Sequence, residues 1–334
     1  MGRLPLVLVT GATGAIGPLV VNAFHAAGHS IRTLSIDPPS IKAWPDDVET
    51  RFGDITNSPI VRAAMRDVDT VIHLAALLHI VNPQRVLLEK YERINVGGTA
   101  TVVAAAVHAS VRRIVFFSTI AVYGKSSGLI LTEDAPVQPD SFYASTKLEA
   151  EKIVLAAKGS DGENIGSILR LAAVYGSRIK GNYRNLVQSL ARGRFIPIGN
   201  GRNRRTLVYD KDVAHAAVLA AGNDAAAGKI YNVSDGDFHS VSEIIGAICD
   251  ALGRKFPGFE IPVLPVRWGA GLMEATMGLL GRQSPVTREN IDKYTEDIAV
   301  DSHRIRDELG FRPQYDLATG WQETIQEMRR IGEL

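Results

Sequence analysis

Short apolar runs alternate with longer amphipathic stretches along the first half of the chain. Between the first two runs, Ile16, Val20, Phe24 and Ala27 recur every three to four positions, and Gly28 follows where a helix would stop. Alternating strands and helices are typical of βαβ units, so the pattern predicts an α/β fold with a doubly wound parallel sheet. The expected strands are Leu4–Val9, Ile31–Ile36, Val48–Phe52, Thr70–Leu74, Arg113–Ser118 and Ile165–Leu169.

The pattern changes after about residue 170. Gly176–Arg205 is rich in Gly, Asn and Arg, and Phe256–Pro265 contains three prolines. Irregular segments of this kind build binding sites more often than they form repeated βαβ units, so they predict a smaller second domain. The apolar stretch Trp268–Leu280 fits a lid or core helix of that domain, with a lipid-binding helix as the alternative.

Composition and charge exclude several classes of protein. Of the 334 residues, 46% are apolar and 22% are charged, which is neither a disordered nor a low-complexity chain. The net charge of +1 creates no field that would attract nucleic acid or an anionic membrane, so we expect neither partner. The single Cys249 fits a reducing compartment, and no secretory cleavage site follows the first apolar run, so we expect a cytoplasmic protein.

Three glycines follow the first expected strand and open the first expected helix. Glycine at this spacing permits a tight turn and lets backbone N–H groups at the helix N-terminus approach a pyrophosphate. Strand, loop and helix together predict a dinucleotide-binding loop of the Rossmann type. The loop residues expected to bind the dinucleotide are Gly11, Thr13, Gly14, Ala15, Ile16 and Gly17.

Two acidic residues follow the next two expected strands. Asp37 comes 20 residues after Gly17, where a carboxylate can accept hydrogen bonds from the adenosine ribose and repel a 2′-phosphate, which favours NAD over NADP. The alternative for Asp37 is a turn made with Pro38 and Pro39. Asp54 fits either adenine recognition or a helix cap.

A phenol, an ammonium and two hydroxyls form the expected catalytic group. Ser118 and Thr119 end a strand at the carboxyl edge of the sheet, where ligands of open α/β folds bind. Tyr143 and Lys147 stand at i and i+4, which puts both on one face of a helix. The ammonium can hold a ribose hydroxyl and lower the pKa of the phenol, which begins near 10 and must fall by about two or three units to act near neutrality. We therefore expect a proton-transfer site.

On these residues, the sequence resembles the extended short-chain dehydrogenase/reductase family over nearly its whole length. Within that family it resembles the branch that acts on nucleotide-linked sugars, such as the UDP-sugar 4-epimerases. The resemblance implies that NAD is the cofactor and that Ser118 lies beside the nicotinamide. It also implies that Thr119 and Tyr143 take part in catalysis and bind the substrate. Further residues carry the resemblance on the cofactor side: Asp54, Ile55, Leu74, Ala75, Ala76 and Asn95.

The resemblance also implies a division into domains and an assembly. Residues 1–170 and about 205–234 would form the dinucleotide-binding domain, and about 171–204 and 235–334 the interleaved substrate domain. Helices at about 88–108 and 143–158 would form the four-helix interface of a homodimer.

The substrate side follows from the same resemblance. Asn182 would hold the diphosphate or sugar of a UDP-sugar, Ile196 and Ile198 would border the uracil, and Arg205 would clamp the diphosphate, because a guanidinium binds phosphate bidentately. The alternative for Arg205 and its neighbours is a solvated surface loop. Arg288 is the candidate for a second phosphate-binding arginine.

Three departures from the family pattern refine the expected reaction. Ala173 replaces an Asn that donates to the diphosphate in many relatives, and Ile120 with Ala121 replaces the Asp-Glu pair of the 4,6-dehydratases, which disfavours dehydration. Ile298 stands where hexose 4-epimerases carry a large aromatic, which would leave room for an N-acetyl group.

We therefore expect NAD-dependent 4-epimerisation of a UDP-hexose or UDP-N-acetylhexosamine through a 4-keto intermediate. The alternatives are a 4-keto-sugar reductase or 3β-hydroxysteroid-like dehydrogenase of the same family, and a non-catalytic dinucleotide sensor. No metal site is expected, since no histidine pair has metal-ligand spacing with a third ligand, and His73 fits a buried strand-end position.

Overall fold

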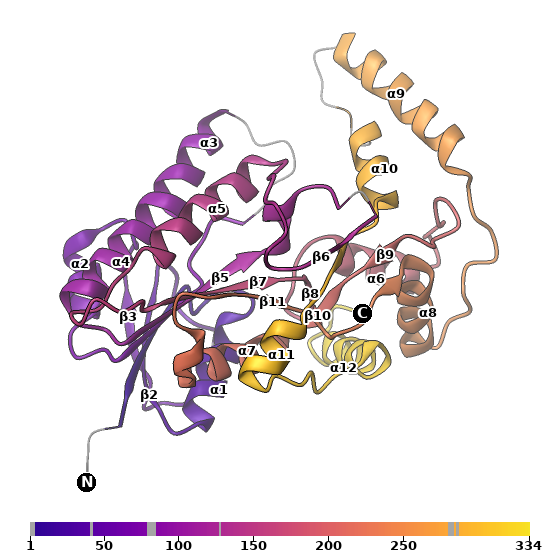
Figure 1. Cartoon of the computed structure of the whole chain (residues 1–334). Helices are drawn as coiled ribbons and strands as arrows, with labels where there is room; N and C mark the ends of the chain where they lie inside the picture. Colours follow the sequence, from indigo (N-terminus) through magenta and orange to yellow (C-terminus); the bar gives the residue numbers. More distant parts are fainter. Residues whose placement is uncertain (1–3, 41–42, 79–84, 127, 280–283, 285–286) are drawn as a thin grey trace.

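Seven parallel strands form the central sheet of the computed structural model, which describes residues 4–40, 43–78, 85–126, 128–279, 284 and 287–334 (Figure 1). The strand order is β11-β7-β5-β4-β1-β2-β3, and every neighbouring pair is parallel. Each of the six expected runs contains one strand, and the seventh comes from the second half of the chain. The strands are β1 (Leu6–Thr10), β2 (Ser30–Ser35), β3 (Glu49–Phe52), β4 (Thr70–His73), β5 (Arg113–Thr119), β7 (Gly166–Leu171) and β11 (Ile230–Val233).

Helices cover both faces of this sheet, which explains why the central strands are buried along their length. On one face, the apolar sides of α1 (Gly17–Ala26), α7 (Asp210–Gly222) and α11 (His303–Leu309) share a core with β1 and β7. On the other face lie α2 (Ser58–Ala64), α4 (Thr99–His108) and α5 (Phe142–Leu155). The doubly wound α/β fold is thereby confirmed. Two short helices and one π-helix complete this part: α3 (Arg85–Tyr91), η1 (Glu92–Gly98) and the 3₁₀ turn η3 (Asp224–Ala226).

The order of the strands reverses at β1, which lies between β2 and β4. The loops that follow β1 and β4 therefore leave the sheet toward opposite faces, and the crevice between them is where open α/β folds bind ligands. Gly11 shows how closely the two loops approach, because a Cβ there would lie 2.7 Å from the Cα of Ala75.

The remaining elements gather beyond the carboxyl ends of the strands (Figure 1). Three helices pack around Trp321, which stacks on Tyr175 with ring centroids 4.5 Å apart. They are α6 (Asn182–Ala191), α8 (Val241–Leu252) and α12 (Leu317–Arg330). Three two-stranded sheets pair β8 (Ala173–Tyr175) with β10 (Leu207–Tyr209), β9 (Arg204–Arg205) with β12 (His239–Ser240), and β6 (Ile130–Leu131) with β13 (Ala299–Val300).

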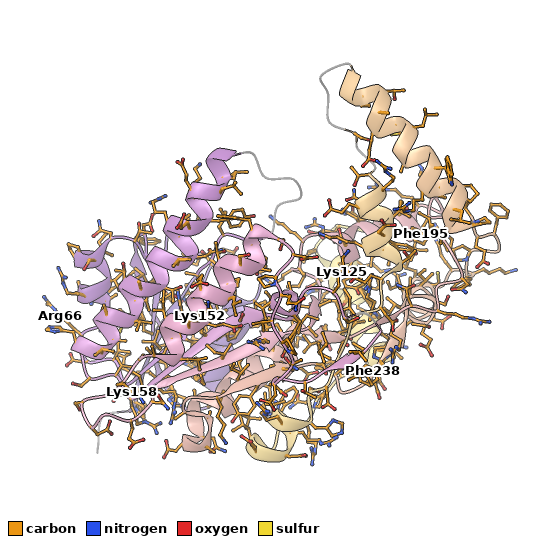
Figure 2. The ribbon with its side chains drawn as sticks, turned by 45° about the horizontal axis from the view of Figure 1, so that its top comes forward. Arg66, Lys125, Lys152, Lys158, Phe195 and Phe238 are labelled. Carbon is orange, nitrogen blue, oxygen red and sulfur yellow. The ribbon has the colours of Figure 1, made fainter. Side chains whose placement is uncertain are left out.

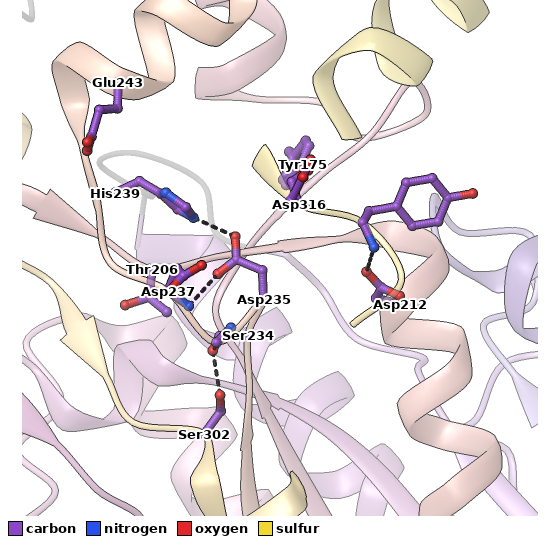
Figure 3. Close-up of polar contacts among 12 residues, drawn as sticks. Tyr175, Thr206, Asp212, Ser234, Asp235, Asp237, His239, Glu243, Ser302 and Asp316 are labelled. Carbon is purple, nitrogen blue, oxygen red and sulfur yellow. Dashed lines mark hydrogen bonds and ion pairs between the residues drawn. The ribbon is translucent and has the colours of Figure 1, made fainter. Parts of the chain in front are cut away.

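Polar contacts tie the C-terminal segment to the sheet and to α7 (Figure 3). The Ser234 and Ser302 hydroxyls are hydrogen-bonded at 2.7 Å, just past the end of β11. The buried carboxylate of Asp212 accepts from the backbone N–H groups of Gln314 and Tyr315. The segment that leads into α12 is therefore fixed against α7.

The helix pair α9 (Val263–Leu279) and α10 (Arg288–Thr295) projects from the body of the molecule (Figure 1). Ala270 is buried, but most other described side chains of α9 are exposed, so the expectation of a core helix at Trp268–Leu280 was wrong. Leu280 itself is outside the described residues. None of the described helices has the length and apolarity needed to cross a bilayer.

Candidate functional site

The glycine loop closes tightly between β1 and α1. A Cβ on Gly17 would lie 2.1 Å from the carbonyl oxygen of Ala12, so only glycine fits this close turn. Gly14 is exposed, and a Cβ there would meet only the Gly11 carbonyl oxygen, at 3.1 Å. Packing within the protein therefore does not require glycine at position 14. This is expected where a ligand approaches the backbone.

The N-terminus of α1 carries no side-chain cap. The side chain of its N-cap residue, Ile16, cannot accept a hydrogen bond, whereas the side chains of Asn57, Ser141 and Ser240 cap α2, α5 and α8. The first N–H groups of a helix have no intrahelical acceptor and carry partial positive charge. An uncapped helix at the switch point is therefore suited to a diphosphate, and the contacts of Thr13, Ala15 and Ile16 with it stay predictions.

The two acidic candidates lie after β2 and β3. Asp37 is exposed two residues past β2. Asp54 accepts a hydrogen bond from Thr56 N–H at 2.8 Å and lies 3.8 Å from the guanidinium of Arg93. Asn57, not Asp54, caps α2, so the helix-cap alternative for Asp54 was wrong, whereas its role in adenine binding stays a prediction.

Asn95 holds the loop that follows β4. It lies in the π-helix η1, a distortion that is frequent at functional sites. Its side-chain amide accepts from Leu77 N–H at 2.7 Å and donates to the Leu77 carbonyl and to the Thr146 hydroxyl. Asn95 therefore ties the loop containing Leu74, Ala75 and Ala76 to the helix that carries Tyr143. Ile55 is buried against Gly98 in the same region.

His73 is a structural residue at the end of β4. Its ring nitrogens are hydrogen-bonded to the hydroxyls of Thr10, at 2.7 Å, and Thr99, at 2.9 Å. Complete burial, and secondly the charge of Lys147, lower the pKa of His73 to about 3. The ring is therefore neutral at physiological pH and joins the β1 and β4 strand ends.

Tyr143 and Lys147 occupy one face of α5, as predicted. Ser141 caps this helix by accepting from Ala144 N–H, which puts Tyr143 in the first turn, where its ring lies 6.3 Å from that of Tyr91. Lys147 is buried, with its Nζ 3.9 Å from the centre of the Phe116 ring of β5. The helix thus directs Lys147 toward β5 and Tyr143 toward Tyr91 of α3.

The pKa values of the pair differ from the sequence expectation. Burial, followed by the influence of Tyr91, raises the pKa of Tyr143 to about 12, and burial lowers the pKa of Lys147 to about 7 despite the opposing effect of Glu151. Removing water disfavours both the phenolate and the ammonium, and burial is the largest cause of both shifts. Lys147 therefore does not depress the pKa of Tyr143 below its usual value in this state.

Glu151 is a member of the site that sequence reasoning missed. Its carboxylate accepts from the hydroxyl of Ser118 at 2.5 Å and forms a two-pronged ion pair with Arg170, with Nη2 at 2.7 Å. All three side chains are buried. The signal was available, because Glu151 follows Lys147 by the same four residues that separate Lys147 from Tyr143. Ser118 is therefore oriented by Glu151.

Thr119 ends β5 and caps the 3₁₀ turn η2 (Ile120–Tyr123). Its hydroxyl accepts from Ala121 N–H at 3.2 Å and is partly exposed, so it can still donate a hydrogen bond to a ligand. Ser118 and Thr119 thus differ. The Ser118 hydroxyl is hydrogen-bonded to Glu151, whereas the Thr119 hydroxyl is partly exposed at the end of β5.

The residues at this edge fit a dinucleotide. Among the described residues, Lys147 Nζ has no hydrogen-bond acceptor, although the side chain is 2% exposed. A buried ammonium normally has such partners, and ribose hydroxyls would supply them. Together with the uncapped α1 and the open backbone at Gly14, this is the donor set that a bound pyrophosphate and ribose require.

The substrate-side candidates lie on α6 and in the loop that follows it. Asn182 is exposed at the first position of α6, after Gly181, whose φ is +119°. Ile196 is exposed, and Ile198 pairs with Ile261 of the loop before α9. Their contacts with a nucleotide stay predictions.

Arg205 and Arg288 stand at opposite ends of α10. The Arg205 guanidinium donates to the carbonyl oxygens of Lys293, Tyr294 and Glu296, and so caps the C-terminus of α10. Arg288 begins the helix and pairs with Glu274 of α9 at 2.9 Å. Arg204 pairs with Asp297, so the solvated-loop alternative does not describe Arg204 or Arg205. Both expected phosphate ligands already have protein partners, and their role in substrate binding remains a prediction.

Within the described ranges, no cluster of three or more His, Cys, Asp or Glu side chains could hold a metal ion.

Comparison with known proteins identifies the family of this chain. The model of the NAD dependent epimerase/dehydratase family matches residues 7–234. The chain is 28% identical to UDP-glucose 4-epimerase of Vibrio cholerae over 96% of its own length and 94% of that protein. It is 27% identical to the 3 beta-hydroxysteroid dehydrogenase/Delta 5-->4-isomerase of Mycobacterium tuberculosis, strain CDC 1551 / Oshkosh, over 94% and 87% of the two chains.

A solved structure agrees. MoeE5 in complex with UDP-glucuronic acid and NAD superposes with a TM-score of 0.74 at 27% identity, covering 99% of this chain and 100% of that one. The match extends beyond the dinucleotide-binding half to the elements around Trp321. The chain therefore belongs to the NAD dependent epimerase/dehydratase family, as the resemblance to extended short-chain dehydrogenases/reductases predicted.

Proposed function

We propose that this protein catalyses the NAD-dependent 4-epimerisation of a UDP-hexose or UDP-N-acetylhexosamine through a 4-keto intermediate. The observation that carries the proposal is the helix face of Tyr143 and Lys147 beside the hydroxyl end of β5, in a chain of the epimerase/dehydratase family. NAD would accept a hydride from the sugar C4 and later return it to the opposite face. The glycine loop, the α1 N-terminus, Asp37 and Lys147 would hold it.

Tyr143 is the group that moves the proton. Its phenolate oxygen takes the proton of the sugar 4-hydroxyl as the C4–H bond breaks, and gives it back when the 4-keto group is reduced. The pKa of about 12 means that the phenol is neutral at pH 7 before a ligand binds. Binding must therefore favour the phenolate, and positive charge near the oxygen does so.

Lys147 supplies positive charge from the same helix face. Its own pKa of about 7 leaves the ammonium only partly populated at neutral pH, and Glu151 is the neighbour that raises this pKa. Arg170 pairs with Glu151 and holds that carboxylate in place. Arg170 and Glu151 thus support the positive charge of Lys147, which favours the phenolate of Tyr143.

The strand-end hydroxyls orient the substrate. Thr119 would donate to or accept from the sugar 4-hydroxyl, since its hydroxyl is partly exposed and not committed as a donor to a described residue. Ile120 and Ala121 follow it with side chains that carry no proton-transfer group. This supports epimerisation over elimination of water at C5 and C6.

The second candidate is an oxidoreductase in which the nicotinamide exchanges at each turnover. The similarity to the 3 beta-hydroxysteroid dehydrogenase favours it, because that relative and the epimerase match the chain about equally well. A dinucleotide sensor without catalysis would have no need of the Tyr143 and Lys147 pair.

The experiment is a screen of UDP-sugars, each incubated with the purified protein and NAD, with products analysed by NMR. We expect a pair of C4 epimers that reaches the same ratio from either side. A 4-keto-6-deoxy product would show dehydration, and a stable keto product with matching NADH would show an oxidoreductase. No conversion of any UDP-sugar, with steroid oxidation instead, would contradict the proposal.

We also propose a homodimer through α4 and α5, whose inner faces pack on the sheet and whose outer faces are left at the surface. Sedimentation of the purified protein tests this proposal, and a monomeric mass at micromolar concentration would contradict it.

A further inference from the structure

The outer face of α9 is apolar and exposed. Leu264, Trp268 and Leu272 follow one another at four-residue spacing, which puts them in one stripe along the helix. Their exposed fractions are 69%, 80% and 68%. Figure 1 shows α9 projecting from the body, with α10 beside it. Large apolar side chains gathered on one exposed face mark an interaction surface.

The charged side chains of α9 point toward α10. Its only two charged residues both pair with α10: Arg267 with Asp292 at 2.7 Å, and Glu274 with Arg288 at 2.9 Å. The inner face of α9 is therefore satisfied by α10, and the outer face is left without a charge. The stripe of Leu264, Trp268 and Leu272 therefore has no partner among the described residues.

The apolar surface continues into the segment before α9. Phe256, Phe259 and Ile196 are all exposed. The two segments that carry them are joined by backbone hydrogen bonds, from Ile261 N–H to the Pro197 carbonyl at 2.9 Å and from Gly199 N–H to the Ile261 carbonyl at 2.8 Å. The three side chains therefore lie in two paired segments, one of which leads directly into α9.

Positive charge borders this surface. Arg254 and Lys255 directly precede Phe256, and Arg192 and Arg194 precede Ile196. All four are exposed, and none forms an ion pair with a described residue. The Arg254 guanidinium lies beside Gly193, which brings the two pairs together. Between Ser177 and Arg205 the sequence contains basic residues but no Asp or Glu.

We propose that this surface docks on an anionic lipid bilayer, with α9 lying in the plane of the interface. An apolar stripe with an exposed Trp, bordered by Arg and Lys, complements acyl chains and anionic headgroups at once. A second copy of this chain fits less well, because a symmetric contact would bring the same unpaired cations together. The net charge of the whole chain is only +1, so attraction to the bilayer would come from this basic, apolar surface alone. The proposal differs from the expectation of no membrane partner. It is independent of the proposed reaction.

The experiment measures binding of the full chain to vesicles, by co-sedimentation and by Trp fluorescence. Of the three tryptophans, Trp321 is 1% exposed and Trp44 is partly buried, so a change in emission on binding reports Trp268. We expect co-sedimentation and a blue shift with phosphatidylglycerol vesicles. With phosphatidylcholine vesicles, or at 1 M salt, binding should be at least tenfold weaker.

Matched variants separate the two parts of the surface. Leu264→Glu with Leu272→Glu should abolish vesicle binding, whereas Leu4→Glu, at another exposed leucine near the N-terminus, should not. Arg254→Gln with Lys255→Gln should weaken binding to anionic vesicles about tenfold. Arg66→Gln with Lys158→Gln, on the far side of the molecule, is the control (Figure 2).

The proposal is overturned if the wild-type chain does not bind phosphatidylglycerol vesicles, or if the α9 variant binds as well as the wild type. Sedimentation of the same proteins without lipid tests the other occupant. A wild-type assembly that dissociates only in the α9 variant would assign the surface to a second copy of the chain. UDP-sugar conversion by the α9 variant should equal that of the wild type in solution, so failure of this proposal and of the proposed reaction are distinguishable.

Discussion

At the residue scale, the proposed mechanism depends on Tyr143. Tyr143→Phe removes the proton acceptor without removing the ring that packs beside Tyr91. We expect kcat to fall by about 10²- to 10⁴-fold, the usual contribution of a general base, with little change in melting temperature. Steady-state kinetics and thermal unfolding measure the two effects. Full activity of the variant would rule out the mechanism.

Glu151 should act through Lys147. Because its carboxylate raises the pKa of Lys147, Glu151→Gln should lower that pKa below its present value of about 7. Activity that requires the ammonium should then decline at a lower pH on the alkaline side than in the wild type. A pH–rate profile measures this displacement, and an unchanged profile would reduce Glu151 to a packing role.

The same substitution leaves Arg170 buried without a carboxylate. Breaking a buried ion pair from one side costs about 3–5 kcal/mol, so Glu151→Gln should unfold at markedly lower denaturant concentration. Ser118→Ala removes one hydrogen bond to Glu151 and keeps the ion pair, so it is the matched control and should cost about 1–2 kcal/mol.

At the scale of elements, the glycine loop offers a pair of contrasting substitutions. Gly17→Ala would push a Cβ into the Ala12 carbonyl, so the β1–α1 turn should not form and the protein should be strongly destabilised. Gly14→Ala meets only the Gly11 carbonyl, at 3.1 Å, and should fold but bind NAD more weakly. Urea unfolding and NAD titration distinguish the two, and equal stability of both variants would contradict this interpretation of the loop.

The junction of β1 and β4 should make stability depend on pH. The folded-state pKa of His73 is about 3, whereas an unfolded His titrates near 6.5. Between these values the unfolded state binds more protons, so this contribution is fully present above about pH 6.5 and is lost as the pH falls toward 3. We expect the slope, at most about 1.4 kcal/mol per pH unit, to be smaller in His73→Asn. Equal slopes would contradict it.

The sequence predicted the sheet-forming half well because two periodicities decide it. Runs of buried strand residues and three-to-four-residue helical spacing are local patterns, and parallel connections leave few arrangements open. The pairing of Tyr143 with Lys147 needs only helical spacing. Arg205 could not be predicted in the same way, because its carbonyl acceptors lie about 90 positions away on α10.

At the scale of the whole molecule, α9 shows where pattern reasoning fails. Its apolar residues resemble those of a core helix, and only the folded chain shows that Trp268 is exposed and that Arg267 and Glu274 face α10. The pKa of Tyr143 likewise depends on burial by distant segments. We propose the division into a dinucleotide-binding part, residues 1–170 and about 205–234, and a substrate part, since β11 returns to the central sheet.

The central claim is that one NAD molecule stays bound while a UDP-sugar is oxidised and reduced again. The most direct measurement incubates purified protein with UDP-glucose or UDP-N-acetylglucosamine, with no added cofactor, while following the C4 epimer and the absorbance of NADH. We predict that many equivalents of epimer form per protein while free NADH does not accumulate. Conversion that stops unless NAD or NADH is supplied in amounts equal to the product would contradict the account.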